Sequence, residues 1–430
     1  MSFPTAVERV RAALDAAHAT QGTLNAFISI DDERALERAA SIDRRLEDGE
    51  DVGTLAGVPI ALKDIIDHAG RVTTCGSAFY AKNADTTAPC ISRLEEEGAV
   101  IIGRANLHEF AFGFNSENEH WGPVRNPWDT DTSAGGSSGG SGAAVAAGIT
   151  PIAIGTDTGG SVRVPAALCG TYGLKVTYGA IPLDGVFPLV PDIDTVGPLA
   201  DSMEGIDLGY RAMSGDDRPE PERRGLRLGV PEPWYEKAPI EDDIEAAFEE
   251  VVASLRTLGH EIHPIEMPDT GPSPHIIAAI AEVADVHREF RQRGERYGQQ
   301  VETRIASEEE VTPEQIAEAR EWQRMLRARF ADALATVDFL ITPTVPARRK
   351  FIGHDLIGDK SHRTVLSYFT AIVNHALHPA LALPITNSGT PPASLQVIGA
   401  LGSEPSLIAL GRWLEEVGMV GFTPAPGEFT

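Results

Sequence analysis

The chain has 430 residues, of which 42% are hydrophobic and 23% charged, so it is long and apolar enough to bury a sizeable core. Its formal net charge of −27 opposes binding to nucleic acid or to acidic membranes through a general electrostatic field. No stretch has the roughly 20 apolar residues of a membrane span, or the pattern of a signal peptide. Its cysteines, Cys75, Cys90 and Cys169, are widely spaced, as in a reduced cytoplasmic enzyme without disulfides.

Helical and strand patterns alternate along the chain. Amphipathic helices are expected over residues 6–17 and 31–46, and a helix of small residues over 143–148. Residues 150–154 are then predicted to form a short buried strand. Thr312-Pro-Glu-Gln315 has the form of a capping box and predicts the start of a further helix.

One lysine, Lys63, lies within the apolar segment Val58–Ile66. Since the chain has six lysines against thirty arginines, its position is conspicuous. A lysine on an apolar segment usually ends a strand and extends its ammonium to water. Desolvation, however, lowers a lysine pKa by several units and leaves the amine neutral enough to act as a base. Both interpretations of Lys63 remain open on this pattern alone.

A serine-glycine run over residues 133–142 allows three interpretations. A flexible linker would not lead directly into a helix of small residues, as this run does. A phosphate-binding loop needs a lysine and a hydroxyl after its last glycine, but Gly140 is followed by serine and glycine. A nucleophile elbow around Ser137 needs a preceding hydrophobic strand. Residues 126–132 are polar and turn-like, so we expect no strand before Ser137.

A second run, Gly155–Arg163, follows the predicted strand, where open α/β sheets usually carry their sites. We expect its backbone N–H groups at Thr158, Gly159, Gly160 and Ser161 to form an oxyanion hole, because glycines let several N–H groups turn toward one point. Ser161 is the candidate nucleophile.

A serine hydroxyl needs a neighbouring base, which is usually histidine. None of the 12 histidines lies in either serine-glycine run. The pairs His260/His263 and His375/His378 have spacings that a helix could use for a metal, but neither completes a metal motif. No metal or cofactor is therefore implied, and Lys63 is the candidate base.

These features resemble the amidase signature family. The resemblance is close over residues 50–200 and continues only through short segments beyond them. The matching segments follow the order and spacing of the family: Leu55–Asp64, Gly103–Gly113, Gly122–Trp128, Gly135–Gly148, Gly155–Pro165 and Cys169–Lys175.

The resemblance implies a Ser-Ser-Lys relay. Ser161 would be the nucleophile, Ser137 the bridging serine after a cis peptide bond from Gly136, and Lys63 the final proton acceptor. The implied reaction is hydrolysis of a non-peptide C–N amide bond through an acyl-Ser161 intermediate, releasing ammonia or an amine.

The resemblance also implies a single amidase domain over residues 1–430 with an α/β/α fold, a mixed central β-sheet flanked by helices. Its core would span about residues 50–200, and a variable, substrate-shaping part about 215–350, entered through an expected surface connection at 215–225. In the nucleophile loop we expect Asp157 and Arg163 to pair, because polar groups in buried loops need partners.

The substrate expected from the resemblance is a small-molecule amide, aryl acylamide or carbamate, and the sequence does not select among them. The residues expected at the acyl pocket are Phe112, Gly113, Phe114, Phe187 and Leu189.

A free-standing amidase is our main interpretation of the chain, because residues 280–350 look like one. Residues 106–118 instead resemble the A subunit of glutamine-dependent aminoacyl-tRNA amidotransferase, which releases ammonia from glutamine for a partner enzyme. A catalytically silent binding protein of the same fold is a third interpretation. A conventional α/β hydrolase with Ser137 as nucleophile is a fourth, and it would need an essential histidine. A homodimer is expected from the family alone.

Overall fold

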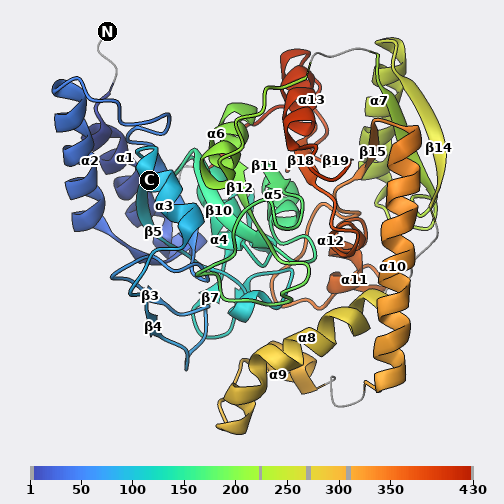
Figure 1. Cartoon of the computed structure of the whole chain (residues 1–430), viewed down its shortest axis with the longest axis horizontal. Coiled ribbons are helices and arrows are strands. Elements are labelled where there is room, and N and C mark those ends of the chain that lie inside the picture. The colour runs from blue at the N-terminus through green and yellow to red at the C-terminus, as the bar shows by residue number, and fades with distance from the viewer. Residues whose placement is uncertain (1–3, 222–224, 268–272, 307–310, 428–430) are drawn as a thin grey trace.

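Within the residues that the structure describes, an 11-stranded mixed β-sheet runs through the molecule (Figure 1). The structure is a computed structural model that describes residues 4–221, 225–267, 273–306 and 311–427. Strand β2 pairs in parallel with β5 and β10, and β13 in parallel with β14 and β15, whereas the other pairs are antiparallel. In spatial order the strands are β1 (Phe27–Ile30), β5 (Val100–Ala105), β2 (Pro59–Lys63), β10 (Ile152–Asp157), β12 (Thr195–Ala200), β11 (Tyr172–Lys175), β18 (Ala380–Pro384), β19 (Ser394–Ile398), β15 (Phe339–Pro343), β13 (Arg227–Pro233) and β14 (Glu261–Met267).

Helices cover both faces of this sheet, because its central strands are apolar on both sides. In β2, Ile60 and Leu62 belong to one core cluster, while Ala61 between them belongs to another. The first cluster includes residues of α3, α6, α7 and α13, and the second includes residues of α1, α4 and α5. The helices are α1 (Ala6–Leu24), α2 (Asp32–Glu47), α3 (Pro89–Glu96), α4 (Gly139–Ala146), α5 (Arg163–Cys169), α6 (Met203–Ser214), α7 (Asp242–Thr257), α8 (Ser273–Gln292), α9 (Gln299–Ala306), α10 (Pro313–Thr336), α11 (His362–Leu366), α12 (Ala371–His375) and α13 (Glu404–Glu416).

Short elements lie outside the main sheet. Figure 1 shows α8 and α9 extending away from the sheet, next to the lower end of α10. A 3₁₀ turn spans Glu109–Ala111. The described part of the chain also forms four two-stranded ribbons: β3 (Val72–Thr73) with β4 (Lys82–Asn83), β6 (Glu117–Asn118) with β7 (Gly122–Pro123), β8 (Arg125–Asn126) with β9 (Asp129–Ser133), and β16 (Leu356–Ile357) with β17 (Lys360–Ser361).

The predicted α/β fold with a mixed, helix-flanked sheet is confirmed. The capping box at Thr312 is present, with Thr312 and Gln315 satisfying each other's backbone N–H groups at the start of α10. The helix predicted over residues 6–17 is longer in the structure and continues to Leu24 as α1. The strand predicted over residues 150–154 begins two residues later and ends three residues later, as β10. Residues 222–224 of the expected surface connection lie outside the described residues.

The prediction that no strand precedes Ser137 was wrong. Strand β9 ends at Ser133, four residues before Ser137, although its sequence Asp-Thr-Asp-Thr-Ser is polar. It forms a ribbon with β8 rather than a strand of the central sheet, so it needs no apolar faces.

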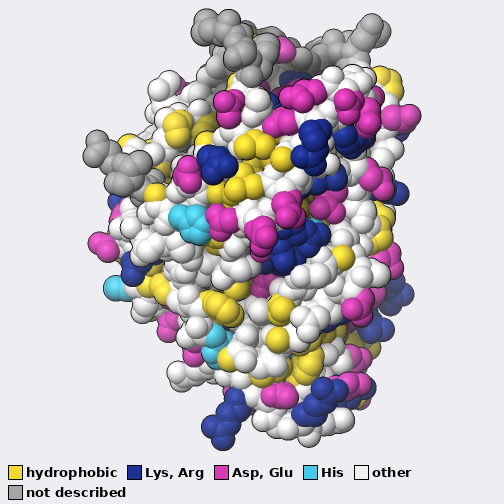
Figure 2. All heavy atoms as spheres, turned by 90° about the vertical axis from the view of Figure 1, so that its left-hand side faces the viewer, with side chains coloured by type: hydrophobic (Ala, Val, Ile, Leu, Met, Phe, Trp, Pro, Cys, Tyr) yellow, Lys and Arg dark blue, Asp and Glu magenta, His cyan; other side chains and the backbone are white. Residues whose placement is uncertain are grey.

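Two further expectations concerned charge and membranes. Figure 2 shows the side of the molecule that carries α1 and α2, where acidic and basic side chains are interspersed. Within the described residues, no helix is both long enough and apolar enough to cross a membrane.

The central strand β10 gives a test of the core. Ile154→Ala removes a fully buried side chain and should lower the free energy of unfolding by about 2–5 kcal/mol, because it leaves a cavity. Leu258→Ala, at a residue that is 51% exposed, is the matched control and should change it little. Denaturant unfolding of the two variants measures the difference between their free energies of unfolding. Equal midpoints would contradict the assignment of Ile154 to the core.

Candidate active site

The buried amine of Lys63 joins the two serine-glycine runs. Lys63 ends β2, is fully buried, and donates from Nζ to the Ser137 hydroxyl at 2.8 Å and to the Thr156 hydroxyl at 2.7 Å. Of the two interpretations left open by the sequence, extension of the ammonium into water does not hold. Thr156, which no sequence motif singled out, is the second hydroxyl that fixes the amine.

Burial controls the protonation of Lys63. Desolvation lowers its pKa to about 7, against the opposing effect of the Asp157 and Asp194 carboxylates. A protein-bound amine with a pKa near neutrality is half unprotonated at neutral pH, which an ordinary lysine is not. The site thus contains a lysine that can accept a proton.

Ser137 lies where the first run turns into α4. Its peptide bond with Gly136 is cis, as the resemblance implied. A side chain on Gly136 would place its Cβ 2.8 Å from the backbone nitrogens of Asn115 and Ser116, so only glycine fits there. The two runs also meet through the backbone, since Ser138 N–H donates to the Ser161 carbonyl at 3.3 Å.

A buried ion pair holds the loop that carries Ser161. Arg163 donates from Nε and Nη2 to the two Asp157 oxygens at 3.0 and 2.9 Å, and both side chains are fully buried. The Arg163 cation lowers the pKa of Asp157, which overcomes the opposite effect of burial. The expected Asp157–Arg163 pair is therefore present, and α12 and β19 extend it through Asn374 and Gln396.

The same carboxylate changes the expected set of oxyanion donors. Gly160 N–H donates to Asp157 Oδ1 at 2.8 Å, so this N–H is occupied within the loop. Thr158, Gly159 and Ser161 remain as candidate donors. The expectation for Gly160 was wrong because a buried carboxylate needs more hydrogen-bond donors than Arg163 alone supplies.

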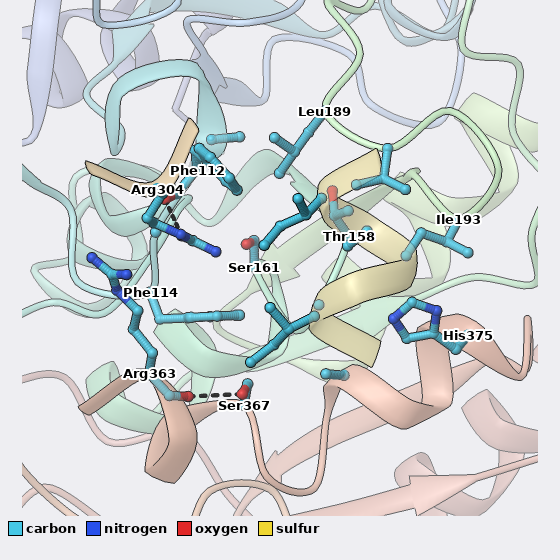
Figure 3. A pocket seen from close by; sticks show the side chains of 18 of the residues that line it. Phe112, Phe114, Thr158, Ser161, Leu189, Ile193, Arg304, Arg363, Ser367 and His375 are labelled. Carbon is cyan, nitrogen blue, oxygen red and sulfur yellow. Dashed lines mark hydrogen bonds between the residues drawn. The ribbon is translucent and has the colours of Figure 1, made fainter. Parts of the chain in front are cut away.

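A cavity of about 180 Å³ opens beside Ser161 (Figure 3). Four of the residues expected at the acyl pocket line it: Phe112, Gly113, Phe114 and Leu189. Phe187 does not line this cavity. It packs instead against Tyr80 and Phe110 in a cluster of aromatic rings, with ring centroids 5.2 Å apart in both pairs.

Several other residues of the site carried no signal in the sequence. Asp194 accepts from the Thr158 hydroxyl at 2.5 Å and from the backbone of Leu189 at 2.8 Å, so it ties the nucleophile loop to the pocket wall. Burial raises the pKa of Asp194 to about 6. Arg304 and Arg363, both far from Ser161 in sequence, also line the pocket. Only the fold brings these residues together.

In the part of the chain that the structure describes, no group of three or more His, Cys, Asp or Glu side chains could hold a metal ion. His375 lies at the pocket, while His378 donates from Nδ1 to the Gly399 carbonyl at 2.9 Å in the core.

Comparison with known proteins identifies the class and the family. A family model described as Amidase matches residues 8–408. The chain is a hydrolase of C–N amide bonds. It belongs to the amidase signature family, which confirms the resemblance in the sequence.

Similar proteins cover nearly the whole chain. The A subunit of glutamyl-tRNA(Gln) amidotransferase from Carboxydothermus hydrogenoformans is 33% identical over 463 residues, covering 96% of this chain and 94% of that protein. The AtzE subunit of 1-carboxybiuret hydrolase from Pseudomonas sp. is 35% identical over 429 residues, covering 93% of each. A solved structure described as an amidase matches with a TM-score of 0.91 at 32% identity, covering 96% of both chains.

The buried ion pair gives a stability test. Asp157→Asn leaves the Arg163 cation buried without its carboxylate, and should lower the free energy of unfolding by about 3–5 kcal/mol. Asp131→Asn, at an exposed carboxylate of β9, is the control and should have little effect. If both variants unfold at the same denaturant concentration, the pair does not hold the loop.

Proposed function

We propose that the chain hydrolyses a linear amide through an acyl-enzyme on Ser161, with Ser137 and Lys63 as its proton relay. The observation that carries this proposal is the 2.8 Å contact between the Lys63 amine and the Ser137 hydroxyl in a fully buried position. A buried amine of lowered pKa supplies the base that histidine supplies in other serine hydrolases.

In the proposed mechanism each group of the relay gives up one proton as it accepts another, and Lys63 is the final acceptor. Ser161 Oγ attacks the amide carbonyl and gives its proton to Ser137, whose own proton passes to the neutral Lys63 amine. The tetrahedral oxyanion is stabilised by backbone N–H groups of Thr158, Gly159 and Ser161. The relay then reverses and protonates the leaving nitrogen as the C–N bond breaks. Water repeats the sequence on the acyl ester and frees the acid.

The relay can be tested with a fluorophosphonate probe and peptide mass spectrometry. We expect an adduct on Ser161, formed at a rate that rises with pH through about 7, because only the neutral Lys63 amine accepts the proton. Lys63→Arg should abolish labelling, since a guanidinium stays protonated. Lys82→Arg, on the two-residue strand β4, is the control and should label like the unaltered chain.

Two results would count against this assignment. An adduct on Ser137 would favour the elbow-type hydrolase, and unchanged labelling of the Lys63→Arg variant would remove lysine as the base. The absence of any adduct would favour the silent binding protein.

A second candidate is the glutaminase component of a tRNA amidotransferase, which the name of the Carboxydothermus relative favours. It would use the same relay on glutamine. Co-purification of the tagged chain from its native cells, followed by an assay of ammonia release from glutamine, separates the two candidates. We expect the chain to hydrolyse amides when purified alone, and glutaminase activity that requires a second protein would establish the other candidate.

A further inference from the structure

A buried aspartate, Asp194, lies at the edge of the sheet where β2 and β10 end. Strand β12 runs antiparallel to β10, and its first residue, Thr195, pairs with Asp157, the last residue of β10. The Thr195 hydroxyl donates to the Asp157 carbonyl at 2.9 Å, which fixes this end of the pairing. Asp194 immediately precedes β12, so three neighbouring strands bring it to the edge that also carries Lys63.

The Asp194 carboxylate binds two parts of the active site at once. Its Oδ1 accepts from the Thr158 hydroxyl at 2.5 Å, within the loop that carries Ser161. Its Oδ2 accepts from the backbone N–H groups of Leu189 at 2.8 Å and of Val190 at 3.0 Å, and both residues line the pocket (Figure 3). One side chain therefore holds a candidate oxyanion donor and the pocket wall in a fixed relation.

Asp194 and the candidate base are neighbours of one small cavity. This cavity, of about 10 Å³, is lined by Thr156, Thr158 and Asp194, together with apolar side chains. Thr156 is also the hydroxyl that accepts from the Lys63 amine. Since a single water molecule needs about 10–15 Å³, the cavity has no room for bulk water. The charges of the carboxylate and the amine are therefore poorly screened from each other.

The charge of Asp194 opposes the effect of burial on the lysine. Desolvation lowers the pKa of Lys63 to about 7, while Asp157, Asp194 and Cys75 act to raise it. Asp157 is paired with Arg163, whereas Asp194 has hydroxyl and backbone N–H partners that leave its negative charge in place. Burial raises the pKa of Asp194 itself to about 6, so this carboxyl is mainly ionised at neutral pH.

Other titratable groups face Asp194 from neighbouring elements. Burial raises the pKa of Glu282 on α8 to about 7, and the charges of Asp192 and Asp194 add to this effect. Burial also raises the pKa of the Tyr178 phenol, again with contributions from Asp192 and Asp194. Asp192 N–H donates to the Glu282 carboxylate at 3.2 Å, and the Asp192 side chain is exposed. Asp194 is the carboxyl of this loop that acts on the pKa of Lys63.

We infer that Asp194 is a positioning residue of the active site, which holds Thr158 in place for the oxyanion and keeps the Lys63 amine able to return a proton. The inference rests on the proposed relay and adds to it a group that acts through Thr158 and Lys63. A base that also protonates the leaving nitrogen works best when its pKa lies near the working pH. A desolvated lysine without this carboxylate would hold a proton less readily, and the relay would protonate the leaving nitrogen less well.

The pH dependence of fluorophosphonate labelling tests the electrostatic part of the inference. Asp194→Asn removes the negative charge, so the pKa of Lys63 should fall. The midpoint of the labelling rate against pH should then move to lower pH by about 0.5 unit or more. Asp192→Asn makes the same change on an exposed side chain two residues away and should leave the midpoint unchanged. The midpoint comes from rate constants, which do not depend on the fraction of chains that are folded.

Lysine labelled with ¹³C at Cε gives a direct measurement in the same variants. The chain has six lysines, so the spectrum is simple, and the Lys63→Arg variant identifies the Lys63 resonance. We expect this resonance to titrate near pH 7 in the unaltered chain and at lower pH in Asp194→Asn. The measurement needs no reaction at Ser161. Failure of the proposed function is therefore distinguishable, since it would appear as the absence of a Ser161 adduct in the unaltered chain.

A pair of variants at Thr158 tests the positional part, and it does so even where Asp194→Asn does not fold. Thr158→Val loses the hydroxyl that donates to Asp194, and should slow the labelling of Ser161 by about tenfold or more, as expected for a hydrogen bond to a charged group. Thr158→Ser keeps a hydroxyl at this position and should label like the unaltered chain.

Three results would overturn the inference. The first is an Asp194→Asn variant whose Lys63 midpoint, by labelling or by NMR, is unchanged or higher. The second is an equal shift in Asp192→Asn, which would indicate a general effect of net charge. The third is equal labelling of the Thr158→Val and Thr158→Ser variants. A lower midpoint confined to Asp194→Asn, with slow labelling confined to Thr158→Val, would establish the role of Asp194.

Discussion

The parallel pairing of β2 with β10 is the constraint on which the site depends. Ile60, Ala61 and Leu62 pair with Ile152, Ala153 and Ile154, so both strands end at the same edge of the sheet. Lys63 is the last residue of β2. Thr156 lies near the end of β10, and the nucleophile loop follows that strand. A shift of one residue in this register would turn the lysine to the opposite face of the sheet. The contact between the Lys63 amine and the Thr156 hydroxyl is thus fixed by backbone pairing, and Ser137 meets the same amine from the loop before α4.

Burial of the lysine follows from the same sheet. Apolar clusters on both faces exclude water from the end of β2, and desolvation then lowers the pKa of Lys63. Two buried carboxylates, Asp157 and Asp194, act against this shift. Asp157 is itself neutralised by Arg163, which limits how far it can hold the lysine in its charged form. The ion pair therefore serves both the geometry of the loop and the protonation of the base.

Much of the site was predictable from sequence because it lies in two short, glycine-rich runs. Gly136 and the Asp157–Arg163 pair belong to those runs, and their constraints are local. The environment of the Lys63 amine could not be predicted, because an apolar segment alone does not show whether the side chain at its end reaches water or is buried. The polar strand β9 was missed because a two-stranded ribbon needs no alternation of apolar residues.

The two arginines of the pocket could not be predicted for a different reason. Arg304 and Arg363 lie on α9 and α11, among thirty arginines of which most have no distinguishing pattern. Only tertiary packing places them beside Ser161, whereas the relay residues follow from strand ends. Two kinds of constraint thus meet at the site. The sheet register positions Lys63 next to the start of the nucleophile loop, and the packing of the later helices adds the wall of the pocket that contains both arginines.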